Sequence, residues 1–230
     1  TITGGLGGLG LRAAALLIEC GASYVLLTSR SAHVARSSQG LEAELQSLGE
    51  TALAVSSDSA DASTTTVLLC ACHLVGVLHA AGVADAGLMD TLEPQSVQKL
   101  CGSKAFGASH LNNAMAAAPL EALVLLSSVA SGLGNVGQAN YAQACSYLDS
   151  CAYSLRSSGC VAKSLQLPIT GLGMSTEALR TATEAMQRSH IVPAGFASIG
   201  PEGYVKQLRG QFGLCLSLLS AVQLAHRSDV

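Results

Sequence analysis

The chain opens with the residues TITGGLGGLG at positions 1–10, where a short apolar start leads directly into a run of glycines. A helix-length stretch, Leu9–Glu19, follows the run without a break. Glycines allow a backbone to approach a pyrophosphate, and the first turn of a following helix offers free N–H groups to its charge. A lone glycine motif is weak evidence, but a strand before it and a helix after it form the context that dinucleotide binding needs. The opening therefore predicts a dinucleotide-binding loop, and the alternative is a plain turn in a glycine-rich protein.

Short apolar segments, typical of strands, alternate with longer segments of helical pattern along the rest of the chain. The expected strands are Thr1–Thr3, Tyr24–Thr28, Ala52–Val55, Val75–His79, Leu123–Ser127 and Ala162–Leu167. The expected helices include Leu9–Glu19, Gln39–Leu48, Glu93–Ala116 and Gln138–Arg156. Such alternation is typical of a parallel sheet that is buried on both faces and binds ligands beyond the carboxyl ends of its strands. We predict an α/β fold, a Rossmann-like doubly wound parallel sheet with helices on both faces.

The pattern changes after the last expected strand. Residues 175–189 form a polar helix pattern between loops rich in helix breakers, and we expect a lid excursion over about residues 170–200. A further helix is expected near Pro201–Phe212. Because no repeat, linker or second domain is visible, we expect a single domain over residues 1–230. The chain starts inside a strand, so we expect it to be a fragment of a longer polypeptide.

The composition limits the classes of function. The 230 residues are 49% hydrophobic and 12% charged, which is ample for one sizeable core. A net charge of −3 and 3% aromatic residues favour neither a nucleic acid nor a membrane as partner. The eight cysteines show no zinc-ligand or disulfide spacing. We therefore expect no metal site and reduced thiols, as in a cytoplasmic protein.

Residues at the strand ends indicate which dinucleotide is bound. Arg30 lies twenty residues after Gly10, where an NAD-specific protein carries an acidic residue for the ribose hydroxyls. A guanidinium between two serines suits a 2′-phosphate and favours NADPH, and the alternative is an ordinary solvated arginine. Asp58 is expected to accept from the adenine amino group, and residues 79–82 to lie beside the adenine ribose. The expected cofactor contacts are Thr3, Gly4, Gly5, Leu6, Gly7, Gly8, Leu9, Gly10, Ser29, Arg30, Ser31, Asp58, Ser59, His79, Ala80, Ala81, Gly82, Lys104 and Tyr141.

Three polar residues carry the chemistry that we expect. A ketone that accepts hydride becomes an alkoxide and needs a proton, which a phenol delivers when a cation lies near it. Ser128 lies thirteen residues before Tyr141, and Lys104 lies twenty-four residues before that serine. Each alone has an ordinary alternative, as a core tyrosine, a cap or a surface charge. Their joint position at successive strand ends predicts a carbonyl reductase in which Ser128 holds the substrate oxygen and Tyr141 donates the proton.

Taken together, six stretches resemble the ketoreductase domain of modular type I polyketide synthases, a branch of the short-chain dehydrogenase/reductase superfamily. They are TITGGLGGLG, LTSRS, GVLHAAGV, KAFGASHL, SSVASGLGNVGQANYAQA and GLGM, and the resemblance covers residues 1 to about 212. It implies that Ser128, Tyr141 and Lys104 are the catalytic serine, tyrosine and lysine. It also implies that NADPH reduces the β-keto group of an acyl chain on an acyl carrier protein, with other domains of the same synthase as partners.

The chain departs from that family at several positions. Cys145 stands four residues after the tyrosine, where the family usually carries an asparagine that completes a catalytic tetrad. A thiol is a poor hydrogen-bond partner, and we expect the other three residues to sustain partial or full activity. Residues 84–86 and Leu133 replace the family's markers of product stereochemistry, so the handedness of the product is not readable. Leu167 and Pro168 replace a Trp-Gly pair.

Two other interpretations stay open from the sequence. Cys145 is consistent with a degenerate domain that binds NADPH or shapes an assembly without reducing a substrate. A free-standing short-chain dehydrogenase that acts on small alcohols is the other alternative, and the missing start of the first strand argues against it.

Overall fold

The computed structural model describes residues 1–34, 40–71, 74–83, 87, 89–115, 118, 120–135, 137–168, 170 and 199–211. Within them the chain forms a six-stranded parallel sheet in the order β3-β2-β1-β4-β5-β6. The strands are β1 (Ile2–Thr3), β2 (Val25–Ser29), β3 (Ala52–Ser56), β4 (Gly76–His79), β5 (Ala122–Ser128) and β6 (Ala162–Leu167). The strand order reverses between β1 and β4, which is the switch point of a doubly wound sheet. The predicted Rossmann-like α/β class is confirmed.

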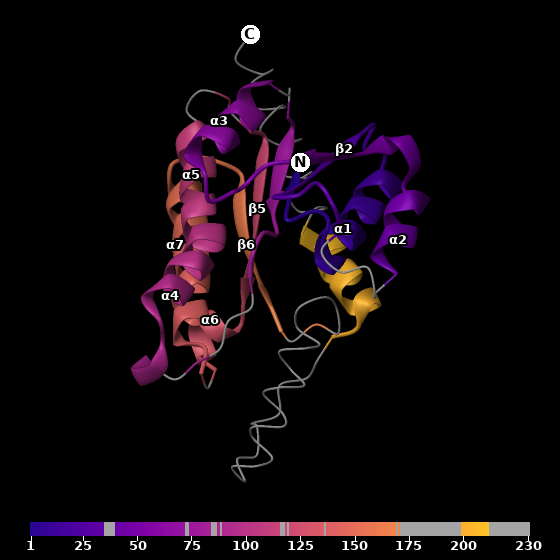
Figure 1. Ribbon diagram of the computed structural model, residues 1–230. Coiled ribbons are helices and arrows are strands. Elements are labelled where there is room, and N and C mark those ends of the chain that lie inside the picture. The colour runs from indigo at the N-terminus through magenta and orange to yellow at the C-terminus, as the bar shows by residue number, and fades with distance from the viewer. Residues whose placement is uncertain are drawn as a thin grey trace.

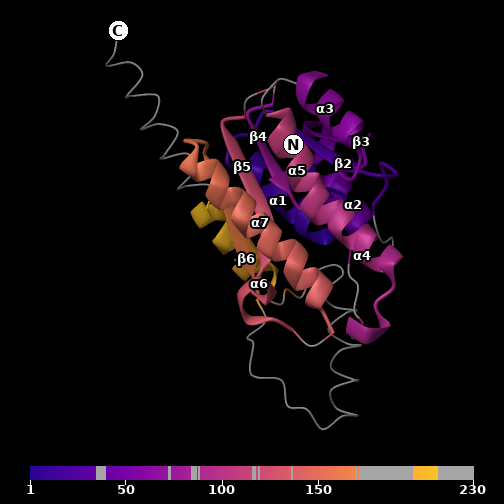
Figure 2. The same ribbon diagram turned by 90° about the vertical axis from the view of Figure 1, so that its left-hand side faces the viewer.

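Helices cover both faces of this sheet. They are α1 (Gly8–Glu19), α2 (Leu41–Ser47), α3 (Ala62–Ala71), α4 (Pro94–Cys101), α5 (Gly107–Ala114), α6 (Ala130–Leu133), α7 (Ala139–Ser157) and a helix over residues 201–211. A π-helical turn, Gly102–Phe106, joins α4 to α5. Figures 1 and 2 show α3, α4, α5 and α7 on one face of the sheet, with α1, α2 and the 201–211 helix on the other. Among the described residues, no helix is both long enough and apolar enough to traverse a bilayer.

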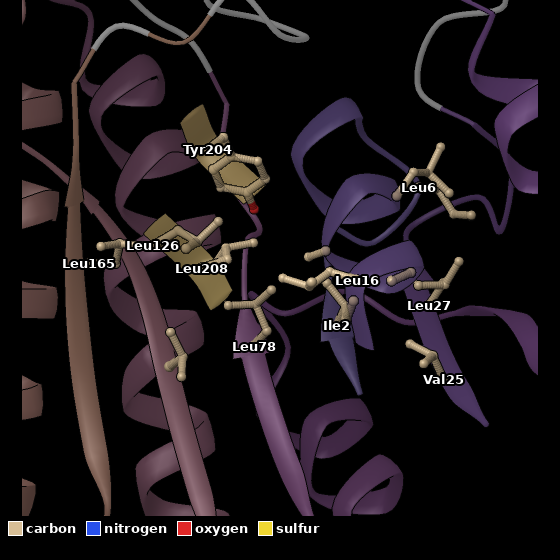
Figure 3. Packing of buried hydrophobic residues seen from close by; sticks show 14 of the residues in the cluster. Ile2, Leu6, Leu16, Val25, Leu27, Leu78, Leu126, Leu165, Tyr204 and Leu208 are labelled. Carbon is tan, nitrogen blue, oxygen red and sulfur yellow. The ribbon is translucent and has the colours of Figure 1, made fainter. Parts of the chain in front are cut away.

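The central strands divide the core between the two faces, because successive side chains of a strand point in opposite directions. On β5, Leu123 and Leu125 pack in the cluster beneath α5 and α7, whereas Leu126 belongs to the cluster on the α1 side. The 201–211 helix completes the second cluster with Tyr204 and Leu208, both fully buried (Figure 3). This helix was expected near Pro201–Phe212. Its last residue lies outside the described part of the chain, as do residues 171–198 of the lid that was expected over about residues 170–200.

Strand β3 differs from the prediction that the strands are buried on both faces. Leu53 is 51% exposed and Val55 is 37% exposed. In the described sheet, β3 is an edge strand that pairs with β2 alone. Its apolar residues satisfied the sequence pattern of a buried strand, but its place at the edge leaves their side chains largely in solvent.

Candidate active site

The glycine run connects β1 to α1 at the carboxyl edge of the sheet. Gly4 adopts a φ of +66°, and a Cβ placed on it would lie 2.7 Å from the Cα of Ala81. A Cβ on Gly10 would lie 2.5 Å from the Cα of Gly5, so the run folds too tightly to admit side chains there. Helix α1 begins at Gly8, and the N–H groups of a first helical turn have no partner within their own helix. The run is a backbone cradle at a helix N-terminus, which fits the pyrophosphate of a dinucleotide.

Two side chains and one backbone carbonyl of the run anchor it to the protein. Thr3 ends β1 and is buried, and Leu6 is fully buried in the core on the α1 side. The carbonyl of Leu9 accepts a hydrogen bond from the hydroxyl of Tyr204 at 3.0 Å. The 201–211 helix therefore holds the first turn of α1 in place from a distant part of the chain.

The residues expected to contact the ribose phosphate follow β2. Arg30 is exposed, and its carbonyl accepts a hydrogen bond from the Ser56 hydroxyl at 2.8 Å. The Ser29 hydroxyl donates to the carbonyl of His33, and the Ser31 hydroxyl accepts from the N–H of His33, both at 3.4 Å. These contacts order the turn after β2 and leave the guanidinium at the surface, on the sheet edge that the glycine run also occupies.

Asp58 and Ser59 lie just beyond β3 on the same edge of the sheet. Oδ1 of Asp58 accepts a hydrogen bond from the N–H of Ala60 at 3.0 Å. The Ser59 hydroxyl donates to the carbonyl of Ser103 at 3.3 Å. The second contact ties the end of β3 to the π-helical turn, which also carries Lys104.

Residues 79–82 leave β4 between the glycine run and Lys104. His79 is 1% exposed; its Nδ1 lies 2.7 Å from Oγ1 of Thr3, and its Nε2 lies 3.0 Å from the carbonyl oxygen of Lys104. A Cβ on Gly82 would lie 3.1 Å from Cε of Lys104, so this glycine makes room for the lysine stem. The sequence placed this segment beside the adenine ribose. In the structure both ring nitrogens of His79 are engaged by protein atoms, and the side chain faces the interior.

Lys104, Ser128 and Tyr141 converge beyond the carboxyl ends of β4 and β5. The Lys104 side chain is buried, and its Nζ donates a hydrogen bond to the carbonyl of Leu126 at 2.8 Å. The same nitrogen lies 5.3 Å from the centroid of the Tyr141 ring, within cation–π range. Ser128 is the last residue of β5; its hydroxyl accepts from the N–H of Ala130 at 3.2 Å, and hydrogen bonding with it lowers the pKa of Tyr141. Three residues that the sequence grouped by their chemistry are thus brought together from three separate elements.

Burial dominates the electrostatics of this cluster. It raises the pKa of Tyr141 above its usual value, and the Cys145 sulfur raises it further, against a lowering hydrogen bond from Ser128. Burial also raises the pKa of the Cys145 thiol, against the opposing charge of Lys104. The pKa of Lys104 is lowered by burial, which Cys145 and Asp149 oppose. At neutral pH the phenol is therefore protonated, and it holds a proton for an alkoxide, which is a far stronger base than a phenolate.

Cys145 lies one helical turn after Tyr141 on α7 and is fully buried. Burial raises the pKa of its thiol, and hydrogen bonding with the Tyr141 side chain opposes that rise. Its carbonyl accepts from the Ser127 hydroxyl at 3.2 Å. Sulfur is a weak acceptor, so the substitution keeps a contact with the phenol but lacks the donors and the strong acceptor of an amide.

A carboxylate that the sequence reasoning missed lies one further turn along α7. Asp149 accepts hydrogen bonds from the Ser131 hydroxyl at 2.6 Å, from the amide nitrogen of Gln166 at 2.8 Å and from the Ser164 hydroxyl. Partial burial raises its pKa, but these hydrogen bonds together lower it below the usual value. The network joins α7 to β6 and to the segment after Ser128. Its only sequence signal is the i, i+4 spacing from Cys145, which places both residues on one helix face.

The other sequence markers have separate outcomes. Leu133 is 69% exposed at the end of α6. Leu167 is buried at the end of β6, and its carbonyl accepts from the N–H of Val129 at 3.0 Å. Residues 84–86 lie outside the described part of the chain. The six cysteines of the described residues form no disulfide with one another, and those residues contain no cluster of three potential metal ligands.

Comparison with known sequences places this site in a family. Residues 1–171 match the family model of the KR domain. The chain is 37% identical to polyketide synthase GfsA of Streptomyces halstedii over 199 residues. The aligned stretch covers 84% of this chain and 3% of that protein. It is 36% identical to the pikromycin polyketide synthase component PikAIII of Streptomyces venezuelae over 168 residues. That stretch covers 71% of this chain and 11% of that protein. The chain thus spans a small part of the curated relatives that it matches.

Solved structures agree with the sequence comparison. A structure of A-type ketoreductases from a modular polyketide synthase is 35% identical with a TM-score of 0.74, over 90% of this chain and 44% of that one. The first ketoreductase of the tylosin synthase is 31% identical with a TM-score of 0.75, and the match covers 93% of this chain and 46% of that one. A short-chain dehydrogenase/reductase from Brucella melitensis shares the fold. It is 20% identical with a TM-score of 0.71, and the match covers 93% of this chain and 87% of that one. With its glycine cradle, its buried lysine and the half-buried serine and tyrosine beside it, this chain belongs to the ketoreductase (KR) domains of polyketide synthases.

Proposed function

We propose that the chain reduces the β-keto group of an acyl chain, carried on an acyl carrier protein, to a β-hydroxyacyl group with NADPH as reductant. The observation that carries the proposal is the buried Lys104 ammonium, 5.3 Å from the centroid of the Tyr141 ring and next to the glycine cradle. The matching relatives are components of polyketide synthases, which supports a carrier-bound substrate and other domains of the same synthase as partners.

The residues of the nucleotide site favour NADPH. The glycine cradle and the N-terminus of α1 hold the pyrophosphate. The exposed guanidinium of Arg30 pairs with a 2′-phosphate, because a planar guanidinium forms charge-assisted, bidentate bonds to phosphate. Bound NADPH supplies the hydride for the carbonyl carbon.

The proton comes from the protein. The Ser128 hydroxyl donates a hydrogen bond to the ketone oxygen and orients the substrate. As the carbon is reduced, the oxygen gains charge and takes the proton of Tyr141, so the product O–H bond forms while the phenol O–H bond breaks. The Lys104 ammonium stabilises the phenolate that remains, since an opposite charge nearby favours the ionised form. The phenolate then regains a proton from solvent.

The test is reduction by the purified chain, followed by NADPH absorbance. The substrates are a β-ketoacyl thioester of N-acetylcysteamine and trans-1-decalone. We expect turnover with both, and a preference for NADPH over NADH of about tenfold or more, as the loss of a charged hydrogen bond implies. Arg30→Ala should remove most of that preference, whereas Arg209→Ala, at an exposed ion pair with Glu19, should keep it. Nucleotide binding without reduction of either ketone contradicts the proposal.

Cys145 favours a second candidate function, a domain that binds the nucleotide without reducing a substrate. A thiol stands beside the Tyr141 side chain in place of an amide, and burial raises the pKa of the phenol. Cys145→Asn separates the two functions. If the wild-type chain reduces the thioester, the second candidate is excluded. If the wild type binds NADPH without turnover and Cys145→Asn leaves it inactive, the second candidate replaces the first.

A further inference from the structure

A buried imidazole joins the nucleotide cradle to the lysine of the proposed reaction. The His79 ring is 1% exposed and lies between two partners, the Thr3 hydroxyl at 2.7 Å and the carbonyl of Lys104 at 3.0 Å. These partners are 76 and 25 residues away from it in sequence. One belongs to the strand that enters the glycine run, and the other to the π-helical turn.

The chemistry of the two partners determines the proton positions on the ring. A carbonyl oxygen only accepts, so Nε2 of His79 carries the hydrogen and donates it to Lys104. A neutral ring then has an unprotonated Nδ1, which accepts the hydrogen of the Thr3 hydroxyl. Burial keeps the ring neutral by lowering its pKa to about 4. Of the two neutral tautomers, only the Nε2–H form satisfies both bonds.

The helix that carries the lysine is irregular where the ring meets it. Lys104 lies in a π-helical turn, and the N–H of Gly107 after the turn reaches the carbonyls of both Gly102 and Lys104. A Cβ on Gly107 would lie 2.8 Å from Cε1 of His79, so the glycine lets the ring reach the backbone. π-helical turns are rare and occur often at functional sites. Here the imidazole supplies an extra donor to the carbonyl of the lysine itself.

We propose that His79 is a positioning residue that couples the glycine run to Lys104, so that the nucleotide cradle and the ammonium keep one fixed spacing. The inference rests on the proposed function for the role of Lys104. The ring touches neither substrate nor the reacting atoms in this account, and it acts through the lysine backbone.

Two variants separate the two bonds of the ring. In His79→Gln the amide nitrogen reaches the position of Nε2 and still donates to Lys104. In His79→Asn the shorter amide stays near the position of Nδ1 and loses that donor. We expect kcat to fall about tenfold or more in His79→Asn and clearly less in His79→Gln, because misplacing a reacting group by an ångström costs up to about a hundredfold. The KM for the thioester should change little in both variants.

A matched control distinguishes positioning from loss of stability. Leu111→Ala opens a cavity under α5, in the core cluster on that face of the sheet, and leaves both hydrogen-bond partners of the His79 ring unchanged. Measured well below its melting temperature, it should keep its kcat even when its Tm falls as far as that of His79→Asn. Equal kcat values in the Gln and Asn variants, or an equal loss in Leu111→Ala, would overturn the proposal.

Two measurements need no turnover and separate this inference from the proposed function. Nitrogen NMR of the wild-type chain should show His79 as the neutral Nε2–H tautomer at pH 7, and an Nδ1–H tautomer contradicts the assigned bonds. Hydrogen exchange of the Gly102–Phe106 amides should be faster in His79→Asn than in His79→Gln. A chain with the expected tautomer and exchange but no reductase activity refutes the proposed function alone. If neither variant folds, the wild-type tautomer still decides.

Discussion

The candidate site has a nucleotide half, formed mainly by backbone, and a proton half, formed mainly by side chains. The nucleotide half, made of β1, β2, β3 and α1, relies on backbone, and Gly4 and Gly10 leave no room for a side chain. The proton half, made of β5, β6, α7 and the π-helical turn, relies on polar side chains such as the buried Lys104 and the half-buried Tyr141. A backbone cradle depends on the absence of atoms and so tolerates no additions. A side-chain cluster depends on several partners, and Lys104, Ser128 and Tyr141 lie together here with Cys145 beside them.

The largest effect should come from the proton half. Tyr141→Phe removes the proton donor but keeps the ring over which Lys104 lies. We expect kcat to fall roughly 10²–10⁴-fold, the usual contribution of a general acid, with NADPH affinity retained. Steady-state kinetics and a fluorescence titration measure the two quantities. Tyr147→Phe, at an exposed position on the same helix, is the control, and similar losses in both variants would refute the role of Tyr141.

The second prediction concerns His79, which links the two halves, and the dependence of folding stability on pH. The unfolded chain binds a proton at a histidine near pH 6.5, whereas burial lowers the pKa of folded His79 to about 4. Between these two values the unfolded state binds the extra proton, so stability falls as pH falls, by up to about 3 kcal/mol. Urea unfolding at a series of pH values measures the slope. His79→Gln should flatten it relative to His33→Gln, a change at an exposed histidine, and an unchanged slope contradicts the buried neutral ring.

A single added methyl group tests the nucleotide half. Gly10→Ala brings Cβ to 2.5 Å from the Cα of Gly5, so the loop must shift. We expect a loss of about 1–3 kcal/mol from crowding, although alanine is the better helix former, and about a tenfold weaker binding of NADPH. Thermal unfolding and fluorescence titration provide the measurements. Gly132→Ala, where no atom lies within 4 Å, should be neutral, and equal behaviour of the two variants shows that the cradle is not tight.

The smallest effect should come from the network beneath the tyrosine. Asp149→Asn retains the shape but removes the charge that accepts three side-chain hydrogen bonds. We expect a loss of about 1 kcal/mol at neutral pH. Because the folded-state pKa of Asp149 is lowered, this contribution is present above the unfolded pKa of about 3.9 and is lost as pH falls through the folded value. Ser157→Ala, at an exposed helix end, is the control, and a difference that persists in strong acid contradicts the assignment.

The nucleotide half was largely predictable from the sequence. The glycine run, the strand before it and α1 after it are contiguous, so the pattern contains the whole local structure. Strand β6 was expected at Ala162–Leu167 and is found there. The exposure of Leu53 on β3 was not predictable, because an apolar run does not reveal whether its strand lies at the edge of the sheet.

In the proton half, the sequence indicated which three side chains would lie together but not the residues that support them. Ser128, Tyr141 and Lys104 were identifiable by residue type, spacing and family resemblance. The environment of Asp149 was not, since Ser131, Ser164 and Gln166 belong to other elements and contact it only in the folded sheet. From the sequence alone, a helical aspartate such as Asp149 is expected to be solvent-exposed.

The sequence by itself determined the class of the fold, the place of the glycine run and the three side chains to which we assign the proton transfer. Those properties follow from hydrophobic period, glycine content and residue chemistry, which are local. Only the tertiary structure decided that the His79 ring turns inward to Thr3 and Lys104 and that Lys104 lies over the Tyr141 ring. Such contacts join strands and helices that are far apart along the chain, and their geometry exists only once the parallel sheet has brought the strand ends together.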